Sequence, residues 1–337
     1  MRIASLRPFS IAMLSILATA GAASAADQPV GPRAVLRVQP GLSDDDKEAT
    51  NVSGAACAVL SGAERSCLLI GDEVRYARFF TLVDDKLHPG KPLYLLPKKD
   101  DAGKKLDETD AEGVAFDGKN YYLIGSHGLN KSGEKQPSRY FIYRVSVDPS
   151  NGLAGDLGDK DHASTSVRRS ANLDGIIDAD TLLHDSAATI PEDGGVNIEG
   201  LAVANDQLYV GFRSPLVDGK ALIASMPVAA AFDDPAARLT FDKIDLGEGQ
   251  AVRDLAAVED GVLILSGPQL RVPGPARVFL WQPGSAVRPL AEIDRSGFGE
   301  GQPEVLTVLA RTPNGYSVLV MADGSENGAP AIYDIPR

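Results

Sequence analysis

Short apolar segments recur along the chain in pairs, and a tight turn joins the two members of each pair. The clearest pair occupies residues 197–215, with Glu199 just before its first segment and Arg213 at the end of its second. Apolar runs of this length, bounded by Gly, Asn or Asp, are typical of paired β-strands. Four other pairs align with this one, which gives five degenerate copies that begin at Asn51, Asp110, Asn197, Val252 and Gln302.

Two further strand-like runs follow most of these pairs, so each copy contains about four strands. Four-stranded repeats of this size predict an all-β fold, a five-bladed β-propeller in which each repeat is one blade. The last copy supplies three strands, and an unassigned strand at residues 34–39 is expected to complete that blade. Such closure removes an exposed sheet edge.

One stretch, residues 148–195, exceeds the length of the repeat. It contains a Gly/Asp-rich loop and a predicted short helix near residues 178–184. We interpret it as an insertion over one face of the propeller. A weak additional blade is the alternative, and would give six blades.

The N-terminus has the layout of a secretory signal peptide, residues 1–25. Arg2 and Arg7 precede an apolar run at residues 9–23, and Ala23-Ser24-Ala25 provides small residues for cleavage. A retained membrane anchor is the competing interpretation, but the apolar run is short for a bilayer span. We therefore expect a periplasmic or secreted monomer whose propeller domain covers residues 26–337.

The net charge disfavours two classes of partner, and the two cysteines predict a disulfide. The formal net charge of -13 disfavours nucleic acid and anionic membrane surfaces, because both repel an acidic protein. The two cysteines, Cys57 and Cys67, fall opposite each other across a hairpin that turns at residues 61–63. In an exported protein they predict a disulfide, with two buried free thiols as the alternative.

The repeats place acidic residues at equivalent positions. The start of the first strand and the end of the second lie at the same end of a blade, because the two strands are antiparallel. With the first strand innermost, a ring around one mouth of the central channel is expected from Glu112, Glu199, Asp254 and Glu304, with Ser53 in the remaining blade.

Carboxylates that converge on a narrow channel raise one another's pKa and need compensation. A divalent cation such as calcium or magnesium would take oxygen ligands of this kind, helped by the residues two positions earlier, Asn51, Asp110, Asn197 and Gln302. Two alternatives remain open: the acids are purely structural, or they act directly in acid/base catalysis.

Residues at the ends of the second strands differ between blades, as recognition of an asymmetric ligand requires. His127 would lie beside the acid ring, where a carboxylate could hold its tautomer during proton transfer. A surface loop histidine is the alternative. Arg213 could clamp a carboxylate or phosphate of a ligand, or neutralise Glu199. Arg139 and His162 could reach the same mouth.

Two hairpins carry a family resemblance. Residues 110–116 with 122–128, and residues 198–202 with 208–216, resemble the bacterial domain-of-unknown-function family 3616, which implies a secreted or periplasmic protein. More remotely, the Glu-Gly-Leu-Ala hairpins are similar to phytase-like esterase and lactonase-type propellers. That similarity implies that Glu112 and Glu199 are ligands of a divalent metal.

Other catalytic machinery is missing from the sequence, which has no Gly-x-Ser-x-Gly, His-Glu-x-x-His, phosphate-binding or dinucleotide motif. The leading hypothesis is a metal-assisted hydrolase of an ester or phosphoester, with a small anionic or ester compound as its ligand. In it the ring acids hold the cation, His127 exchanges protons and Arg213 orients the anionic group. The alternative is a non-catalytic periplasmic propeller that binds a ligand or a protein at the same mouth.

Overall fold

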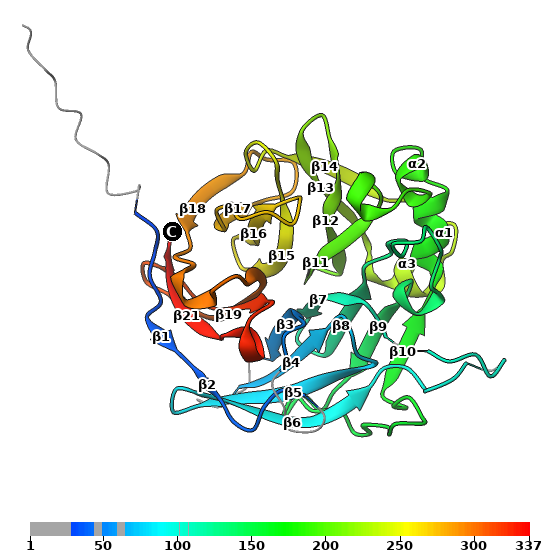
Figure 1. Cartoon of the computed structure of the whole chain (residues 1–337), viewed down its shortest axis with the longest axis horizontal. Helices are drawn as coiled ribbons and strands as arrows, with labels where there is room; N and C mark the ends of the chain where they lie inside the picture. The colour runs from blue at the N-terminus through cyan, green and yellow to red at the C-terminus, as the bar shows by residue number, and fades with distance from the viewer. Residues whose placement is uncertain (1–27, 44–48, 59–64, 101, 107) are drawn as a thin grey trace, which may run out of the picture.

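Five sheets surround a central channel in the computed structural model, which describes residues 28–43, 49–58, 65–100, 102–106 and 108–337 (Figure 1). This arrangement is a five-bladed β-propeller, as predicted, and the sixth-blade alternative is wrong. The predicted signal peptide and the predicted turn at residues 61–63 lie outside the described residues. No helix in the described ranges is long and apolar enough to cross a membrane.

The strands of each blade run outward from the channel in chain order. Blade one contains β3 (Val52–Ala58), β4 (Ser66–Gly71), β5 (Tyr76–Val83) and β6 (Lys86–Tyr94). Blade two contains β7 (Ala111–Phe116), β8 (Asn120–Gly125), β9 (Ile142–Ser146) and β10 (Val167–Ser170). Blade three contains β11 (Asn197–Ala204), β12 (Gln207–Val217), β13 (Lys220–Pro227) and β14 (Thr240–Ile244). Blade four contains β15 (Gln250–Val258), β16 (Gly261–Pro268), β17 (Arg277–Trp281) and β18 (Arg288–Glu292).

Blade five is closed by the N-terminal segment, as the sequence predicts. It contains β19 (Gln302–Thr312), β20 (Gly315–Asp323), β21 (Ala331–Pro336) and β1 (Ala34–Val35). Figure 1 shows β1 beside β21 although they lie at opposite ends of the chain. The single predicted strand at 34–39 is divided in two, because β2 (Arg37–Val38) leaves blade five and pairs in parallel with β6 of blade one.

The stretch at 148–195 contributes to blade two as well as covering it. It supplies β10, the fourth strand of that blade, followed by α1 (Asn172–Asp178), α2 (His184–Ala187) and the 3₁₀ turn η2 (Pro191–Asp193). The predicted helix at residues 178–184 is misplaced, since those residues mostly form the turn between α1 and α2. α3 (Val228–Asp233) and the 3₁₀ turns η1 (Pro137–Arg139), η3 (Ser296–Phe298) and η4 (Glu326–Gly328) complete the fold.

Turn chemistry and small residues explain how the blades form and pack. Asn205 and Asp206 both adopt positive φ, which suits the tight turn between β11 and β12. Gly200 allows β11 to approach β15, because a Cβ atom there would lie 2.8 Å from the side chain of Leu255. Apolar clusters fill the spaces between neighbouring blades, and one of them joins blade five to blade one through Leu36.

The predicted disulfide is confirmed. Cys57 and Cys67 pair across β3 and β4 in register, and the two sulfur atoms are bonded. The bridge therefore closes the innermost hairpin of blade one.

The closure of the ring depends on the burial of Leu36 between blades five and one. Leu36 is 6% exposed, whereas its neighbour Val35 is 66% exposed. We expect Leu36→Ala to lower the free energy of unfolding by about 2–5 kcal/mol, because it leaves a cavity between the two blades. Val35→Ala, the control in the same segment, should change it by less than about 0.5 kcal/mol. Urea unfolding measures both, and equal midpoints for the two variants would contradict this account.

Candidate functional site

A β-bulge in each innermost strand turns one residue toward the channel. The pairing of every innermost strand with its second strand skips one residue near the same mouth. A bulged residue is left out of the ladder, so its side chain is free to point differently from its neighbours. The five skipped residues are Ser53, Glu112, Glu199, Arg253 and Glu304.

The predicted ring position of Asp254 is therefore wrong by one residue. Asp254 follows the bulge, at the position that Gly200 occupies in blade three. Its buried carboxylate accepts hydrogen bonds from the N–H groups of Leu255 (2.8 Å) and Leu306 (2.7 Å), which ties blade four to blade five. Burial raises the pKa of Asp254 well above its usual value, although the two donors oppose this. The sequence alignment placed Asp254 at the position of Glu199 because both are acidic. Arg253 was therefore not predicted to lie in the ring.

Arg253 compensates part of the acid ring. Its Nη1 lies 3.0 Å from Oε2 of Glu199 and 2.6 Å from Oε1 of Glu304. Arg213 adds a second ion pair, 2.7 Å from its Nη1 to Oε1 of Glu199. Of the two roles predicted for Arg213, neutralisation of Glu199 is the one that the contacts show. All four side chains are buried.

The pKa values show where this compensation is sufficient. Burial alone would raise the pKa of Glu199, but Arg213 and Arg253 outweigh it, and the pKa is lowered. For Glu304, burial and the nearby Glu199 outweigh the attraction of Arg253 and raise the pKa to about 8. Glu199 is therefore held as a carboxylate, whereas Glu304 tends to keep its proton.

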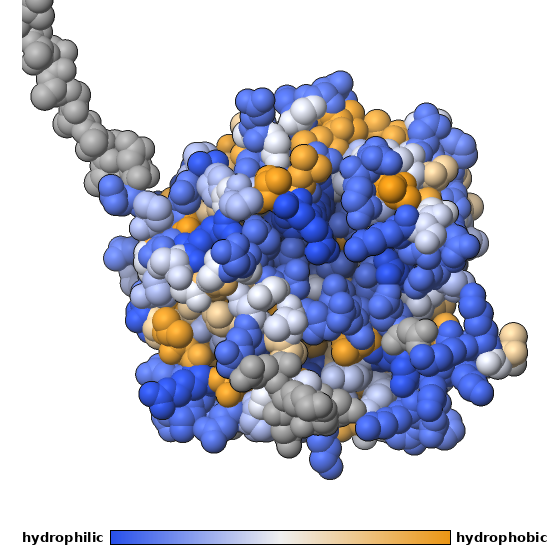
Figure 2. Space-filling model, in the orientation of Figure 1, coloured by the Kyte–Doolittle hydropathy of each residue, from blue (hydrophilic) through white to orange (hydrophobic). Residues whose placement is uncertain are grey.

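A pocket of about 730 Å³ opens above this network. Figure 2 shows it as a hollow at the centre of one face, lined mostly by hydrophilic residues. Its acidic lining residues are Asp72, Glu73, Glu108, Asp110, Glu112, Glu192, Glu199, Glu304 and Asp323. Its basic lining residues are Lys131, Arg139, Arg213 and Arg271. Acids thus outnumber bases around the cavity.

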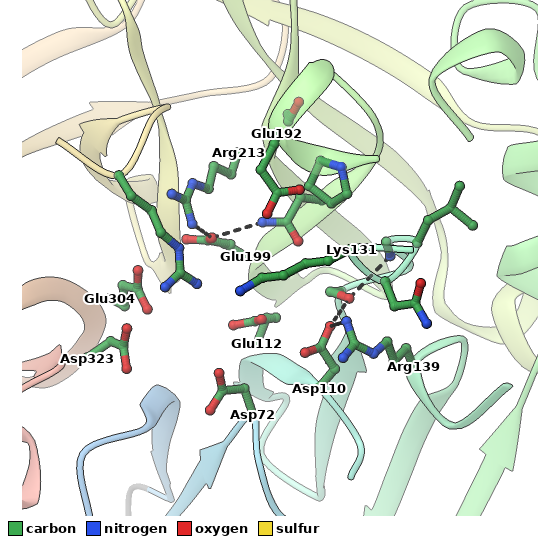
Figure 3. Close-up of a pocket in the computed structure, with 18 of the residues that line it drawn as sticks. Asp72, Asp110, Glu112, Lys131, Arg139, Glu192, Glu199, Arg213, Glu304 and Asp323 are labelled. Carbon is green, nitrogen blue, oxygen red and sulfur yellow. Dashed lines mark hydrogen bonds and ion pairs between the residues drawn. The ribbon is translucent and has the colours of Figure 1, made fainter. Parts of the chain in front are cut away.

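The excess negative charge gathers on blades one, two and five, where Figure 3 shows Asp72, Glu112, Glu304 and Asp323 around one side of the pocket. We call these four residues the acid arc. Among the described residues, none forms a hydrogen bond or ion pair with the side chain of Glu112, and Oδ1 of Asp72 is buried without a partner. Burial and neighbouring carboxylates raise the pKa of Glu112 well above its usual value and that of Asp72 to about 7. Burial also raises the pKa of Asp323.

The wall contributed by blade two is better compensated. Nη1 of Arg139 lies 3.1 Å from Oδ2 of Asp110, and its Nη2 contacts Glu108. The hydroxyl of Ser126 donates to Asp110, which adopts a positive φ of 45° at the end of the preceding loop. Arg139 thus reaches the mouth, as predicted, but as a partner of acids.

The structure places the side chain of His127 away from the pocket, contrary to the prediction. Its φ of 54° turns the chain so that Ser126 and Gly128 line the cavity while the imidazole packs edge-on against Tyr140. Nδ1 lies 2.9 Å from the carbonyl oxygen of Gly125, and burial lowers the pKa of His127 to about 4. A neutral ring behind the wall cannot exchange protons with a ligand in the pocket.

His162 does not line the pocket either. It is exposed in the Gly/Asp-rich loop and pairs with Asp159 at 3.0 Å. The acid arc, in contrast, includes Asp72 and Asp323, to which the sequence reasoning gave no role. Like Arg213, each comes directly after the second-strand residue that pairs with the residue before the bulge. A comparison of these positions by charge could have found them.

The acid arc has the donor chemistry of a site for a hard cation. Carboxylate oxygens are the ligands that calcium and magnesium prefer, and the unpartnered Oδ1 of Asp72 is available for one. Within the described part of the chain, no three acidic, histidine or cysteine side chains are already clustered as a metal site. Water ligands or small side-chain movements would therefore have to complete the coordination.

The strand topology and this pocket define a β-propeller with an acidic, ligand-sized cavity at one mouth of its channel. The chain belongs to the family described as "Protein of unknown function (DUF3616)", which matches residues 93–328 and therefore more than half of the sequence. The family resemblance predicted from the two hairpins is confirmed.

The solved structures that this chain is similar to match it at low sequence identity. A candidate 6-phosphogluconolactonase from Bacteroides uniformis is 14% identical, with 83% of this chain and 71% of that chain covered and a TM-score of 0.33. The PQQ-bound aldose sugar dehydrogenase from Streptomyces coelicolor is 11% identical, with coverages of 88% and 82% and a TM-score of 0.39. A candidate hydrolase from Bacteroides ovatus is 10% identical, with 86% of each chain covered and a TM-score of 0.42. A comparison with curated protein sequences gave no match.

The acid arc binds protons in the folded state and releases them as pH rises. The free energy of unfolding should therefore fall with rising pH. The pKa values of Asp72 (about 7) and Glu304 (about 8) lie above those of unfolded Asp and Glu, about 3.9 and 4.3, so the folded state binds more protons between these limits. The free energy of unfolding should therefore decrease from about pH 5 to pH 8. Urea unfolding in a chelator, at several pH values, measures this slope.

The variant Asp72→Asn should flatten that slope, because it removes one of the groups that release a proton in this range. Glu73→Gln changes the exposed carboxyl next in the chain and should alter the slope much less, because Glu73 contributes less to the raised pKa of Asp72 than burial, Asp323 and Asp110 do. Identical slopes for the wild type and Asp72→Asn would show that Asp72 titrates normally.

Proposed function

We propose that the protein is a divalent-cation-dependent hydrolase of small esters or phosphoesters, with its site in the pocket at the channel mouth. The observation that supports this best is the division of the pocket into two parts. Glu199 is neutralised by two arginines, whereas Glu112 and Asp72 in the acid arc pair with no arginine among the described residues, and burial raises the pKa of both carboxyl groups. A positively charged group in the pocket would stabilise the ionised forms of these two carboxyl groups.

The residues proposed to hold the cation differ from those predicted from the sequence. Glu112 and Glu304 remain, because both line the pocket and have raised pKa values. Asp254 is occupied by backbone donors outside the pocket, and both carboxylate oxygens of Glu199 pair with arginine. Asp323 takes their place, and Asp72 lies beside this set in the pocket lining. When bound, the cation would polarise an ester oxygen and lower the pKa of water.

Proton transfer is assigned to Asp72 in place of His127. A group with a pKa of about 7 can accept and release a proton at neutral pH, which is the property that general acid/base catalysis requires. Cation binding would lower this pKa, so Asp72 would act as the base when it is not itself a ligand.

Orientation of an anionic group is assigned to Lys131 and Arg271 in place of Arg213. The guanidinium of Arg213 is already bonded to Glu199 and, through Nε, to the carbonyl oxygen of Gln269. Lys131 and Arg271 are exposed at the edge of the pocket, and no described residue forms an ion pair with either. Figure 3 shows Lys131 extending into the pocket toward its carboxylates.

A non-catalytic ligand-binding propeller is the second candidate. It is favoured by one observation: among the described residues that line the pocket, none is a histidine. Binding of a cation-bearing ligand needs only the acid arc, whereas hydrolysis also needs a proton-transfer group at the reacting atom.

Calcium should stabilise the protein through the acid arc. At a concentration of one hundred times its Kd, a ligand that binds only the folded state adds about 2.7 kcal/mol of stability. Thermal unfolding should show a rise in Tm with calcium or magnesium that a chelator reverses. Glu112→Gln should raise the Tm without cation, because it removes a buried like charge, and should abolish most of the cation-dependent increment.

The exposed pocket residue Glu73 provides the matched control for this experiment. Glu73→Gln should leave both the starting Tm and the cation-dependent increment close to those of the wild type. A full increment in Glu112→Gln, or no increment with any divalent cation in the wild type, would remove the cation site.

Hydrolysis should depend on the cation and on Asp72. We expect turnover of an aryl ester, an aryl phosphate or a lactone that is lost in chelator, and a loss of about 100-fold in kcat/KM in Asp72→Asn. His127→Ala should retain turnover if it folds, because the imidazole does not reach the pocket. Cation binding without turnover of any of these substrates would favour the non-catalytic candidate.

A further inference from the structure

A connection in blade four places exposed apolar side chains at the edge of the pocket. Residues 269–276 connect β16 to β17 in blade four. Six large hydrophobic side chains are exposed in the described part of the chain, and two of them, Leu270 (58%) and Val272 (47%), lie in this connection. Single exposed apolar residues need no explanation by themselves, so what matters is where each of the two lies relative to the pocket.

Only one of the two faces the cavity. Leu270 and the neighbouring Arg271 line the pocket, whereas Val272 does not. The connection thus presents an apolar side chain and a cation next to each other at the edge of the pocket.

Buried arginines hold the base of this connection. Nη2 of Arg253 donates to the carbonyl oxygen of Pro268 at 2.6 Å, and Nε of Arg213 donates to that of Gln269 at 2.8 Å. The N–H of Gln269 donates to the carbonyl oxygen of Gly249 at 2.9 Å. These hydrogen bonds fix the backbone just before Leu270, so the charged network at the channel mouth positions this residue.

Apolar atoms from blade two and from the segment before blade three also reach the pocket edge. Leu129, in the connection between β8 and η1, and Pro191, in η2, both line the cavity and are half-buried. We call Leu129, Pro191 and Leu270 the apolar lip. Lys131 lies two residues from Leu129, so cations adjoin the lip from both connections.

We propose that the apolar lip binds the hydrocarbon chain of an amphiphilic anion whose head group pairs with Arg271. This inference rests on the proposed function for the location of the site, and it narrows the substrate class to esters or phosphoesters with an apolar chain next to the anionic or reacting group. The acid arc would then face the cation, and the lip would select for chain length.

The test uses n-alkyl phosphates, namely methyl, butyl and octyl phosphate, below the concentration at which the octyl compound forms micelles. Their Kd values are measured by calorimetry on the full mature chain, with calcium and separately in chelator. Burial of one Leu side chain is worth about 1.5–3 kcal/mol when complete. Octyl phosphate should therefore bind the wild type at least about 10-fold more tightly than methyl phosphate.

Two variants of the same connection separate the lip from a general surface effect. Leu270→Asn should reduce the octyl-to-methyl preference by about 5-fold or more, whereas Val272→Asn, which changes an exposed residue outside the pocket, should preserve it. Arg271→Gln should weaken all three ligands by a similar factor. Lack of a chain-length preference, or equal losses in Leu270→Asn and Val272→Asn, would overturn the proposal.

Its failure can be told apart from failure of the proposed function. A chain-length preference that depends on Leu270 but is unchanged by calcium, in a protein that calcium does not stabilise, would support the lip and remove the cation site. Calcium stabilisation with no chain-length preference would do the reverse. If esters are hydrolysed, kcat/KM should show the same dependence on chain length and the same loss in Leu270→Asn.

Discussion

The ion pairs of Glu199 with Arg213 and Arg253 are the constraint on which the channel mouth depends. A carboxylate buried this deeply would lose its charge if it were alone, because desolvation favours the neutral form. Two guanidinium groups, 2.7 and 3.0 Å away, reverse that preference. Removal of either arginine would leave a buried charge without full compensation, which is a far larger perturbation than the loss of an exposed ion pair.

The positions of the arginines also determine which carboxyl groups lack a positive partner. Arg253 divides its Nη1 between Glu199 and Glu304, so Glu304 receives too little compensation to keep its pKa low. No arginine pairs with Glu112 or Asp72 among the described residues, and nearby carboxylates add to the effect of burial in raising the pKa of both. The ring formed by the bulged residues of the five innermost strands is therefore asymmetric in charge. Such asymmetry is what the recognition of a small asymmetric ligand requires.

The repeated hairpins were sufficient to predict the blades, their number and the closure by the N-terminal segment, because apolar periodicity and turn residues are local properties of the sequence. The position of Asp254 could not be read in the same way. A bulge shifts the register by one residue, and the alignment chose the acidic neighbour over the residue that the bulge exposes. The apolar residues that follow, Leu201 in blade three and Leu255 in blade four, carry the correct register.

The side-chain directions at the mouth were harder to predict than the strands. His127 and Ser126 are adjacent in sequence, yet a single positive φ sends one behind the wall and leaves the other facing the pocket. Asp72 and Asp323 were visible as acidic strand ends, but their importance depends on which of their neighbours have partners. That depends on distances between blades, which no single repeat encodes.

Arg213 and Arg253 also link electrostatics to the shape of the pocket. Each spends one set of donors on Glu199 and another on a backbone carbonyl of the connection after β16, at Pro268 or Gln269. Arginine can do this because its planar head carries five donors in fixed directions, whereas an ammonium group acts as a compact point charge. The residues that neutralise the centre of the ring thus also position Leu270 and Arg271 at its edge. Any change in the charge state of Glu199 would therefore also affect the backbone that holds Leu270 and Arg271 at the pocket edge.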